Sequence, residues 1–104
     1  MKVSTVTAAA ISQVCDSRTL RDLHGVGKSI EANLNALGIY TVAQLARSDG
    51  FLLYQRLNNL TGVRQDPCVL DTFRCAVAQA ANPDLPLEQK NWWWWSQRRK
   101  QSRP

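Results

Sequence analysis

The stretch LRDLHGVGKSIEANLNAL, residues 20–37, decides the expected fold of this protein. Leu20 and Leu23 are three residues apart and so share one face of a short helix, for which Ser17 is a suitable N-cap. The glycines of the Gly-Val-Gly run at 25–27 then break the helical pattern, because glycine tolerates the positive φ and the close backbone approach that a tight reversal needs. The stretch predicts two short helices around a tight turn whose valine packs into the core.

The second helix of this hairpin is expected to begin at about Lys28 and to end at Gly38, since glycine accepts the left-handed backbone that often closes a helix. Its apolar stripe is formed by Ile30, Leu34 and Leu37. The stripe indicates that this helix packs one face against the rest of the molecule.

The start of the helix at Lys28 is a candidate anion site. The first N–H groups of a helix have no partner within it and lie at the positive end of its dipole, so they suit a phosphate oxygen. Lys28 adds a mobile charge beside the turn. Such a site contacts the backbone of a nucleic acid and not its bases, and salt weakens it. The same glycines equally fit a tight turn between two packed helices that binds nothing.

The rest of the chain also has helical spacing. Thr41 can cap a short connecting helix, and Ser48-Asp49 can cap a longer one that ends at Gly62. Asp66-Pro67 is a strong start signal for another helix, which ends at Asn82-Pro83. The apolar positions of the three helices are, in order, Val42, Leu45 and Ala46; Leu53, Leu57 and Leu60; Val69, Phe73, Ala76 and Val77. No segment alternates apolar and polar residues as a strand would. The sequence therefore predicts an all-α fold of about five short helices.

An internal sequence repeat supports this arrangement of helices. The pattern Leu-x-x-Leu-x-Gly-Val at residues 20–26 recurs at residues 57–63. The chain is therefore expected to fold as two hairpins in tandem, each of which covers the apolar face of the other. The repeat ends at Val63, because Arg64 stands where the first turn has Gly27. The second turn must therefore differ from the first in shape.

Three regions are expected along the chain: an N-terminal extension at 1–16, a helical domain at 17–83 and a Trp-rich basic tail at 84–104. The extension is rich in alanine but offers little to bury, so a loose helix or disorder is expected there. Its polar residues interrupt any leader-like apolar run, and no stretch approaches the roughly 20 apolar residues of a membrane span. A cytoplasmic protein with no membrane partner is therefore expected.

The formal net charge of +5 is unevenly distributed along the chain. From Asn91 onward there are four basic residues and no acidic ones, namely Arg98, Arg99, Lys100 and Arg103. The ninety residues before them carry nine basic and eight acidic side chains, a net charge of +1. The excess charge therefore lies in the tail, where it favours a polyanionic partner, either nucleic acid or the anionic face of a membrane.

Four consecutive tryptophans stand just before these cations: Trp92, Trp93, Trp94 and Trp95. No regular structure buries four successive side chains on one side, because a helix rotates each by about 100° and a strand alternates them. At least one indole is therefore expected to be exposed. One or two of the others can fold back over the core. The set can also stack bases beside cations that follow a single strand, or lie at a lipid surface.

The three cysteines, Cys15, Cys68 and Cys75, have neither the number nor the spacing of a disulfide framework or a metal site. Cys68 and Cys75 are expected on one helix, about 10 Å apart, which is too far for a bridge. Cys68 falls in the first helical turn, where the dipole favours the nucleophilic thiolate; the alternative is a small buried apolar residue. Asp66 is explained as a cap and Asp71 by an exposed helix face, so no catalytic residue, metal or cofactor is expected.

Two segments carry a resemblance to known proteins. LHGVGK at 23–28, followed by LGI at 37–39 and LA at 45–46, resembles the helix-hairpin-helix proteins of DNA repair and replication. TGVRQDPCVLD at 61–71, together with the Trp-rich end and the basic tail, resembles the small bacterial helix-hairpin-helix proteins of the pathogenicity-locus family. The resemblance covers residues 18–100. It implies a tandem hairpin fold and DNA binding, with no established enzymatic activity.

Two positions depart from the usual pattern of that family. His24 stands where the family has proline before the first glycine, and Glu31 stands where it has a small residue after the second. His24 can still form the turn, and its imidazole can hydrogen-bond a phosphate. The carboxylate of Glu31, in the first turn of the helix, would oppose a phosphate there.

The sequence therefore predicts a non-enzymatic bacterial protein that binds DNA through its backbone without sequence preference. One alternative is a protein-interaction module in which exposed tryptophans bind a partner protein, and another is a thiol-based sensor at Cys68. The residues expected to contact nucleic acid are Gly25, Val26, Gly27 and Lys28 of the first turn, Gly62 and Arg64 of the second, and Arg98, Arg99 and Lys100 of the tail. The candidates for base stacking are Trp92, Trp93, Trp94 and Trp95.

Overall fold

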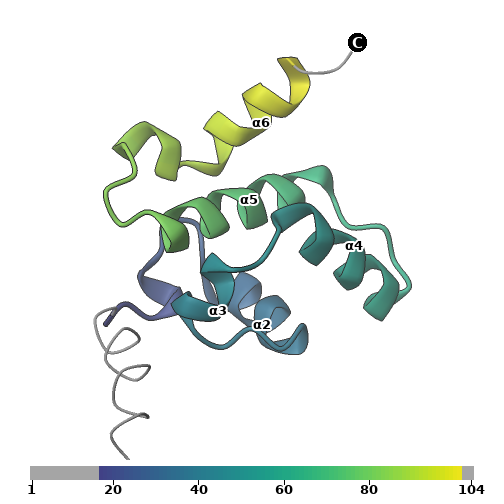
Figure 1. Cartoon of the computed structure of the whole chain (residues 1–104). Helices are drawn as coiled ribbons and strands as arrows, with labels where there is room; N and C mark the ends of the chain where they lie inside the picture. Colours follow the sequence, from purple (N-terminus) through teal and green to yellow (C-terminus); the bar gives the residue numbers. More distant parts are fainter. Residues whose placement is uncertain (1–16, 102–104) are drawn as a thin grey trace, which may run out of the picture.

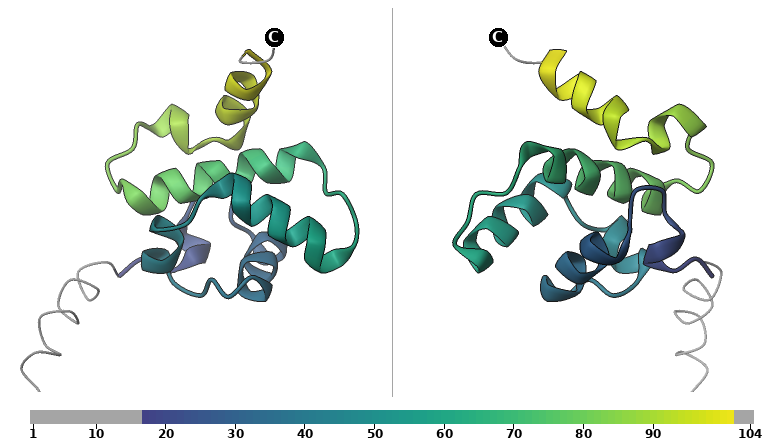
Figure 2. Two further views of the ribbon diagram at one scale, coloured as in Figure 1. Left: turned by 45° about the vertical axis from the view of Figure 1, so that its right-hand side comes forward. Right: turned by 180° about the vertical axis from the view of Figure 1, so that it is seen from behind.

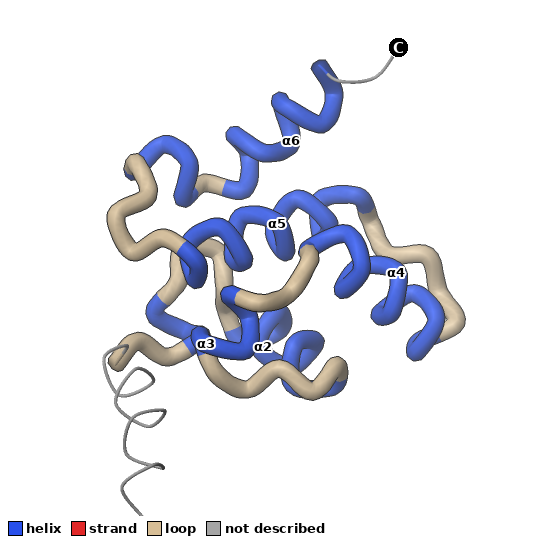
Figure 3. The backbone as a smooth tube through the Cα atoms, viewed as in Figure 1, coloured by secondary structure: helices blue, strands red, loops and turns tan. Residues whose placement is uncertain are grey.

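A computed structural model describes residues 17–101 of the chain, and this part contains five α-helices and two short 3₁₀ turns (Figure 1). In chain order the elements are η1 (Leu20–Asp22), α2 (Lys28–Ala36), α3 (Val42–Ala46), α4 (Gly50–Thr61), α5 (Pro67–Ala81), η2 (Leu87–Lys90) and α6 (Trp92–Gln101). No strand occurs between residues 17 and 101 (Figure 3), which confirms the all-α prediction. The expectations for the N-terminal extension, Cys15 and Arg103 concern residues outside the described part.

Helix α5 is the element on which the others assemble. It lies between α6 on one side and α2, α3 and α4 on the other (Figure 1), and the views of Figure 2 agree with this arrangement. Helices α3, α4 and α6 all pack directly on α5. The predicted start signal of α5 is confirmed, since Pro67 occupies its first turn and the Asp66 carboxylate accepts a hydrogen bond from the Cys68 N–H at 2.8 Å.

The core is a single cluster of apolar side chains from α2, α3, α4, α5 and the turns between them. The predicted stripe of α2 is confirmed, with Leu34 and Leu37 buried and Ile30 partly buried against the core, and the valine of the first turn is buried as expected. The buried apolar residues of the cluster are Leu20, Leu23, Val26, Leu34, Leu37, Ile39, Val42, Leu45, Leu53, Tyr54, Leu57, Leu70, Phe73, Ala76 and Ala80. This cluster joins segments from both halves of the chain.

Leu60 does not belong to this core, although it lies in register with Leu53 and Leu57 on α4. Its side chain is 60% exposed and lines an open groove with Leu37 and Arg56. Near its C-terminal end, α4 extends past the elements that cover its apolar face. Helical spacing identifies the face of a side chain but not how far the neighbouring elements reach.

The first predicted helix is only a 3₁₀ turn, and its N-cap is Thr19 and not Ser17. The Asp22 carboxylate accepts hydrogen bonds from the Thr19 N–H at 2.7 Å and from the Thr19 hydroxyl at 3.0 Å. Leu23 then has extended backbone angles, with φ −78° and ψ 141°. The Thr19–Asp22 contact caps the start of this element, and the element ends after three residues because the backbone becomes extended at Leu23 and enters the glycine turn.

The caps of the next two helices are as predicted. Thr41 and Gln44 form a reciprocal capping box at the start of α3. The Asp49 carboxylate accepts from the first N–H groups of α4, and Gly62 closes that helix in the left-handed region with φ +71°. These helix ends depend only on neighbouring residues, which is why sequence reasoning located them.

Helix α6 brings part of the segment expected as a tail into contact with α5. Asp71 of α5 is fully buried, and the Nε and Nη2 atoms of Arg99 donate to its carboxylate at 2.9–3.2 Å. The Trp95 indole N–H donates to the Gln89 carbonyl at 2.8 Å. The prediction that Asp71 lies on an exposed face is therefore wrong, because α6 covers that face of α5. No helix of the described part is long and apolar enough to span a membrane.

Gly50 marks a very close approach between α4 and α5. A Cβ atom at this position would lie 2.8–2.9 Å from the Cγ, Cα and N atoms of Arg74, two of which belong to the backbone. Real Cβ contacts are essentially never so short, and a backbone neighbour cannot swing aside. Glycine is required here by helix packing and not by its backbone angles.

We expect Gly50→Ala to lower the free energy of unfolding by about 2–3 kcal/mol, because the added methyl group forces α4 away from α5. Urea denaturation followed by circular dichroism measures the change. Gly27→Ala is the matched control, since a Cβ at Gly27 meets nothing within 4 Å; its cost should be about 1 kcal/mol or less. Equal losses in the two variants would contradict the packing argument.

Candidate nucleic-acid interface

The first glycine turn, residues 23–27, joins η1 to α2. Gly25 has φ +86°, in the region that favours glycine, and the side chain of Val26 is buried beneath the turn. Gly27 has φ −94°, which any residue adopts. Apart from its chain neighbours, no atom of the described residues lies within 4 Å of the position that a Cβ would take at Gly27. Glycine at 25 is thus a backbone requirement, whereas glycine at 27 leaves the entrance to α2 uncovered.

Gln79 of α5 holds this turn in place. Its side-chain oxygen accepts a hydrogen bond from the His24 N–H at 2.9 Å, and its side-chain nitrogen donates to the His24 carbonyl at 2.8 Å. The Gln79 side chain is buried, so one amide satisfies both backbone groups of His24 out of contact with bulk water. Sequence reasoning missed this contact. Its only signal was a single glutamine in the otherwise apolar run at 75–81.

Arg18 ties the segment before the turn to the same end of α5. Its guanidinium donates to the carbonyl groups of Gln79 at 2.8 Å and Ala80 at 3.1 Å. The last carbonyl groups of a helix lack partners within it and carry its negative dipole end, so a guanidinium is a favourable cap. Both ends of the 18–24 segment are therefore anchored to the last turns of α5.

The start of α2 is open. Its N-cap, Gly27, has no side chain to cap it, and the first backbone bond is from the Glu31 N–H to the Gly27 carbonyl at 2.9 Å. Within the described residues, the N–H groups of Lys28, Ser29 and Ile30 have no acceptor. Gly27, Lys28 and Ser29 are exposed to solvent. This arrangement suits an anion, because three unused N–H donors face the same helix end.

Glu31 does not occupy this helix end. One of its carboxylate oxygens lies 3.5 Å from the Arg21 guanidinium, in a solvent-accessible ion pair. The pair partly neutralises the charge that was expected to oppose a phosphate, although an exposed ion pair of this kind is weak. The departure from the family pattern at Glu31 therefore leaves the α2 amides uncovered.

A shallow groove of about 300 Å³ joins the first turn to the Trp-rich segment. It is lined by His24, Gly25, Leu87, Lys90, Asn91 and Trp92. The groove places a second cation, Lys90, and the partly exposed indole of Trp92 beside the turn. Sequence reasoning had not linked Lys90 to the turn, since the contact depends on how η2 folds back over α5.

The second turn, residues 62–66, has a different chemistry. The Asp66 carboxylate caps α5, and this hydrogen bond with the Cys68 N–H holds the pKa of Asp66 below its usual value. The start of α5 therefore already holds a negative charge. Val63 is 58% exposed, whereas its counterpart Val26 is buried. The two turns thus differ in shape, as the sequence predicted, and the predicted residues Gly62 and Arg64 are exposed without forming an open helix start.

The three predicted cations of α6 have different surroundings. Arg98 and Lys100 are exposed, and the Arg98 guanidinium lies 4.9 Å from the centre of the Trp94 ring. Arg99 is instead held against the buried Asp71 carboxylate, which raises the pKa of its guanidinium. The prediction of Arg99 as a phosphate contact therefore needs correction, because its charge is balanced inside the fold.

The four indoles divide into two pairs. Trp92 and Trp93 are 37% and 56% exposed, which confirms that the run cannot be buried as a whole. Trp94 and Trp95 are half-buried and meet edge to face, with ring centres 5.1 Å apart. Two of the four indoles therefore fold back onto the protein, which was one of the expected arrangements. The first two indoles remain accessible.

Neither expectation for Cys68 holds. The thiol is exposed and not buried, and its hydrogen bond with the Asp66 carboxylate raises the pKa of Cys68 instead of lowering it. Desolvation and the negative charges of Asp66 and Asp71 act in the same direction, so the thiolate is disfavoured at this position. Cys75 is buried, and burial raises its pKa to about 11. Between residues 17 and 101, no cluster of His, Cys, Asp and Glu side chains could hold a metal ion.

These features define a small all-helical protein in which a buried glutamine fixes a glycine turn and the helix that follows has an open start. The chain belongs to the pathogenicity-locus family, whose model matches residues 14–101. It is similar to the mitomycin resistance protein McrB of Streptomyces lavendulae, with 42% identity over 65 residues. That match covers 62% of this chain and 62% of the relative, so the chain spans less than two thirds of the relative's length. No solved structure gives a significant match.

We expect Gln79→Leu to lower the free energy of unfolding by about 1–2 kcal/mol, because the N–H and carbonyl groups of His24 lose their partner. Gln79→Glu should be at least as damaging at pH 7, since a carboxylate cannot donate to the His24 carbonyl. Gln55→Leu, at an exposed position of α4, is the control and should change stability by no more than about 0.5 kcal/mol. Urea denaturation compares the three, and equal stability of Gln79→Leu and wild type would contradict the role of Gln79.

We expect Cys68 to react slowly with iodoacetamide at pH 7, because a raised pKa leaves little of the reactive thiolate. Asp66→Asn should speed the reaction several-fold, since it removes the charge that disfavours thiolate. Cys75 is the internal control and should react only after unfolding. Mass spectrometry of timed samples measures both rates. Rapid modification of Cys68 in the wild-type protein would restore the thiol-sensor alternative.

Proposed function

We propose that this protein binds the sugar-phosphate backbone of DNA without sequence preference and without catalysis, through a helix-hairpin-helix unit whose hairpin is the first glycine turn. The observation that carries the proposal is the open start of α2. The N–H groups of Lys28, Ser29 and Ile30 have no acceptor in the described part of the chain, and Lys28 is an exposed cation in the same helical turn. Donors of this kind recognise a phosphate and not a base.

Three local features support a phosphate at this position. Gly27 has no side chain, so an anion can approach the α2 amides closely. Gln79 fixes the turn before any ligand arrives, and a preformed site loses less conformational entropy on binding. Arg21 holds the Glu31 carboxylate, which is the nearest negative charge on α2.

Other cations on the surface are candidates for further phosphate contacts. Lys90 lies beside the turn, Arg98 and Lys100 are exposed on α6, and Arg64 is exposed at the second turn. With roughly three to four phosphates neutralised, log affinity for duplex should fall with log salt at a slope of about −3 to −4.

A second candidate function is protein binding through the exposed indoles. Its supporting observation is Trp93, which is 56% exposed on a helix that is otherwise attached to the core. Large exposed aromatic side chains are frequent anchors of protein interfaces. In this case the helical core would serve as a scaffold for α6.

We expect Lys28→Glu to weaken binding of a 20-base-pair duplex at least tenfold, because the new carboxylate would occupy the α2 amides and repel phosphate. The variant should fold normally, since an acidic residue is favourable at a helix start. Arg47→Glu is the control with the same change of charge at another exposed site, and should cost less than threefold. Fluorescence anisotropy at several salt concentrations measures both affinity and slope.

Two results would contradict the proposal. One is a salt slope near zero for the wild-type protein, and the other is equal affinity of Lys28→Glu and wild type. The protein-binding candidate predicts the opposite pattern. Trp93→Ala should abolish binding of a partner protein, whereas Lys28→Glu should leave that binding unchanged.

A further inference from the structure

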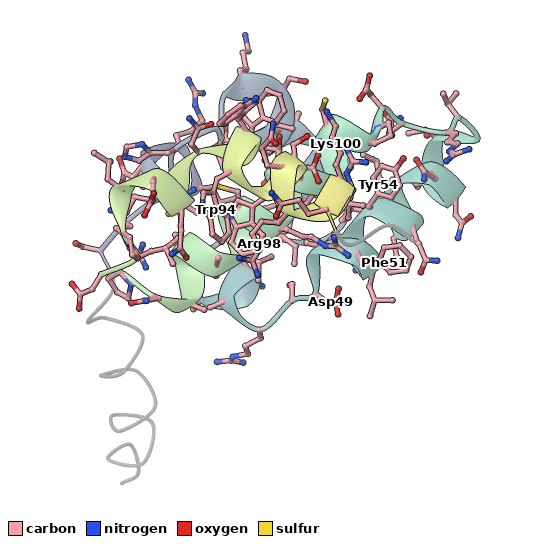
Figure 4. All side chains as sticks on the ribbon, turned by 90° about the horizontal axis from the view of Figure 1, so that it is seen from above. Asp49, Phe51, Tyr54, Trp94, Arg98 and Lys100 are labelled. Atoms are coloured by element: carbon pink, nitrogen blue, oxygen red, sulfur yellow. The ribbon has the colours of Figure 1, made fainter. Side chains whose placement is uncertain are left out.

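A groove of about 250 Å³ between α5 and α6 is lined by Arg74, Trp95, Arg98 and Arg99. Arg74 comes from α5, and the other three residues come from α6. Figure 4, which looks onto α6, shows Trp94, Arg98 and Lys100 along this helix and, in the same view, Phe51 of α4. The Asp71 carboxylate beneath the groove is already engaged by Arg99. The lining therefore carries a net positive charge.

Two guanidinium groups of the groove are oriented by aromatic rings. Arg98 lies 4.9 Å from the centre of the Trp94 ring, and Arg74 lies 5.9 Å from the centre of the Phe51 ring. Within residues 17–101, neither Arg74 nor Arg98 forms a salt bridge. A guanidinium stacked on a ring keeps its N–H groups at the edge available for phosphate. The close approach at Gly50 brings the neighbouring Phe51 to Arg74.

We propose that this α5–α6 groove binds an unpaired nucleic-acid strand, with phosphates on Arg74 and Arg98 and bases against the adjacent aromatic rings. Cations alone attract any polyanion, including duplex DNA. Aromatic surface between cations adds stacking energy to the binding of an unpaired strand only, because the base faces of a duplex are already stacked on each other. The groove combines both features, because its lining includes the Trp95 indole together with three arginines.

Helix α6 contributes residues both to the groove beside the first turn and to the α5–α6 groove. The helix begins at Trp92, which lies beside Gly25, and reaches Arg98 after about 9 Å of helical rise. This distance corresponds to about three nucleotides of a stacked strand. A strand that leaves a duplex held at the first turn can therefore reach the groove. This part of the inference rests on the proposed function.

The test compares three labelled probes: a 20-nucleotide oligothymidylate, a 20-base-pair duplex, and the same duplex with a single-stranded extension. We expect Arg74→Gln/Arg98→Gln to weaken binding of the oligothymidylate and the extended duplex at least tenfold, and of the plain duplex less than threefold. Arg47→Gln/Arg56→Gln removes the same charge at two exposed positions outside the groove and should leave oligothymidylate affinity within twofold. Phe51→Leu tests stacking and should weaken oligothymidylate binding about fivefold.

The outcomes separate this inference from the proposed function. If the wild-type protein binds none of the probes, both fail. If it binds duplex in a Lys28-dependent way but the groove variant binds oligothymidylate like wild type, only the groove assignment fails. Polyglutamate competition as strong as that of oligothymidylate would also overturn it, since a groove for acidic protein segments needs charge but no bases. Circular dichroism confirms that each variant is folded.

Discussion

The structure depends most on one buried side chain, the amide of Gln79, which forms two hydrogen bonds with the backbone of His24. A turn that reverses the chain leaves backbone groups without regular partners, and these must be paired if they are shielded from water. Gln79 supplies a donor and an acceptor in the geometry of a peptide group. The turn therefore has a fixed position on α5, and α2 starts from a fixed point.

Helix α5 makes three different close contacts with the rest of the protein. Gly50 lets α4 approach its backbone, Gln79 holds the first glycine turn, and Asp71 anchors α6 through Arg99. Steric fit, neutral hydrogen bonding and a buried ion pair thus act on one helix. A buried carboxylate is unfavourable without a partner, so the pairing with Arg99 ties α6 to this point of α5.

The two turns show how similar local sequences acquire opposite electrostatic properties. The start of α2 has a glycine cap and a neighbouring lysine, so its N–H groups remain available. The start of α5 has an aspartate cap, which fills the equivalent place with the protein's own carboxylate and also raises the pKa of Cys68. Only the first turn combines an open helix end with cations from elsewhere in the fold, and this asymmetry underlies the proposed function.

The sequence by itself determined the approximate bounds of α2, α3, α4 and α5, the caps at Thr41, Asp49 and Asp66, and the family, because these depend on neighbouring residues and on motif. It also located the open start of α2. Only the tertiary structure decided that Gln79 clamps the turn, that Arg99 is neutralised by Asp71, and that Arg74 joins α6 in a groove. These contacts join residues far apart in the chain, and helical periodicity gives the face of each residue but not which helix will cover it.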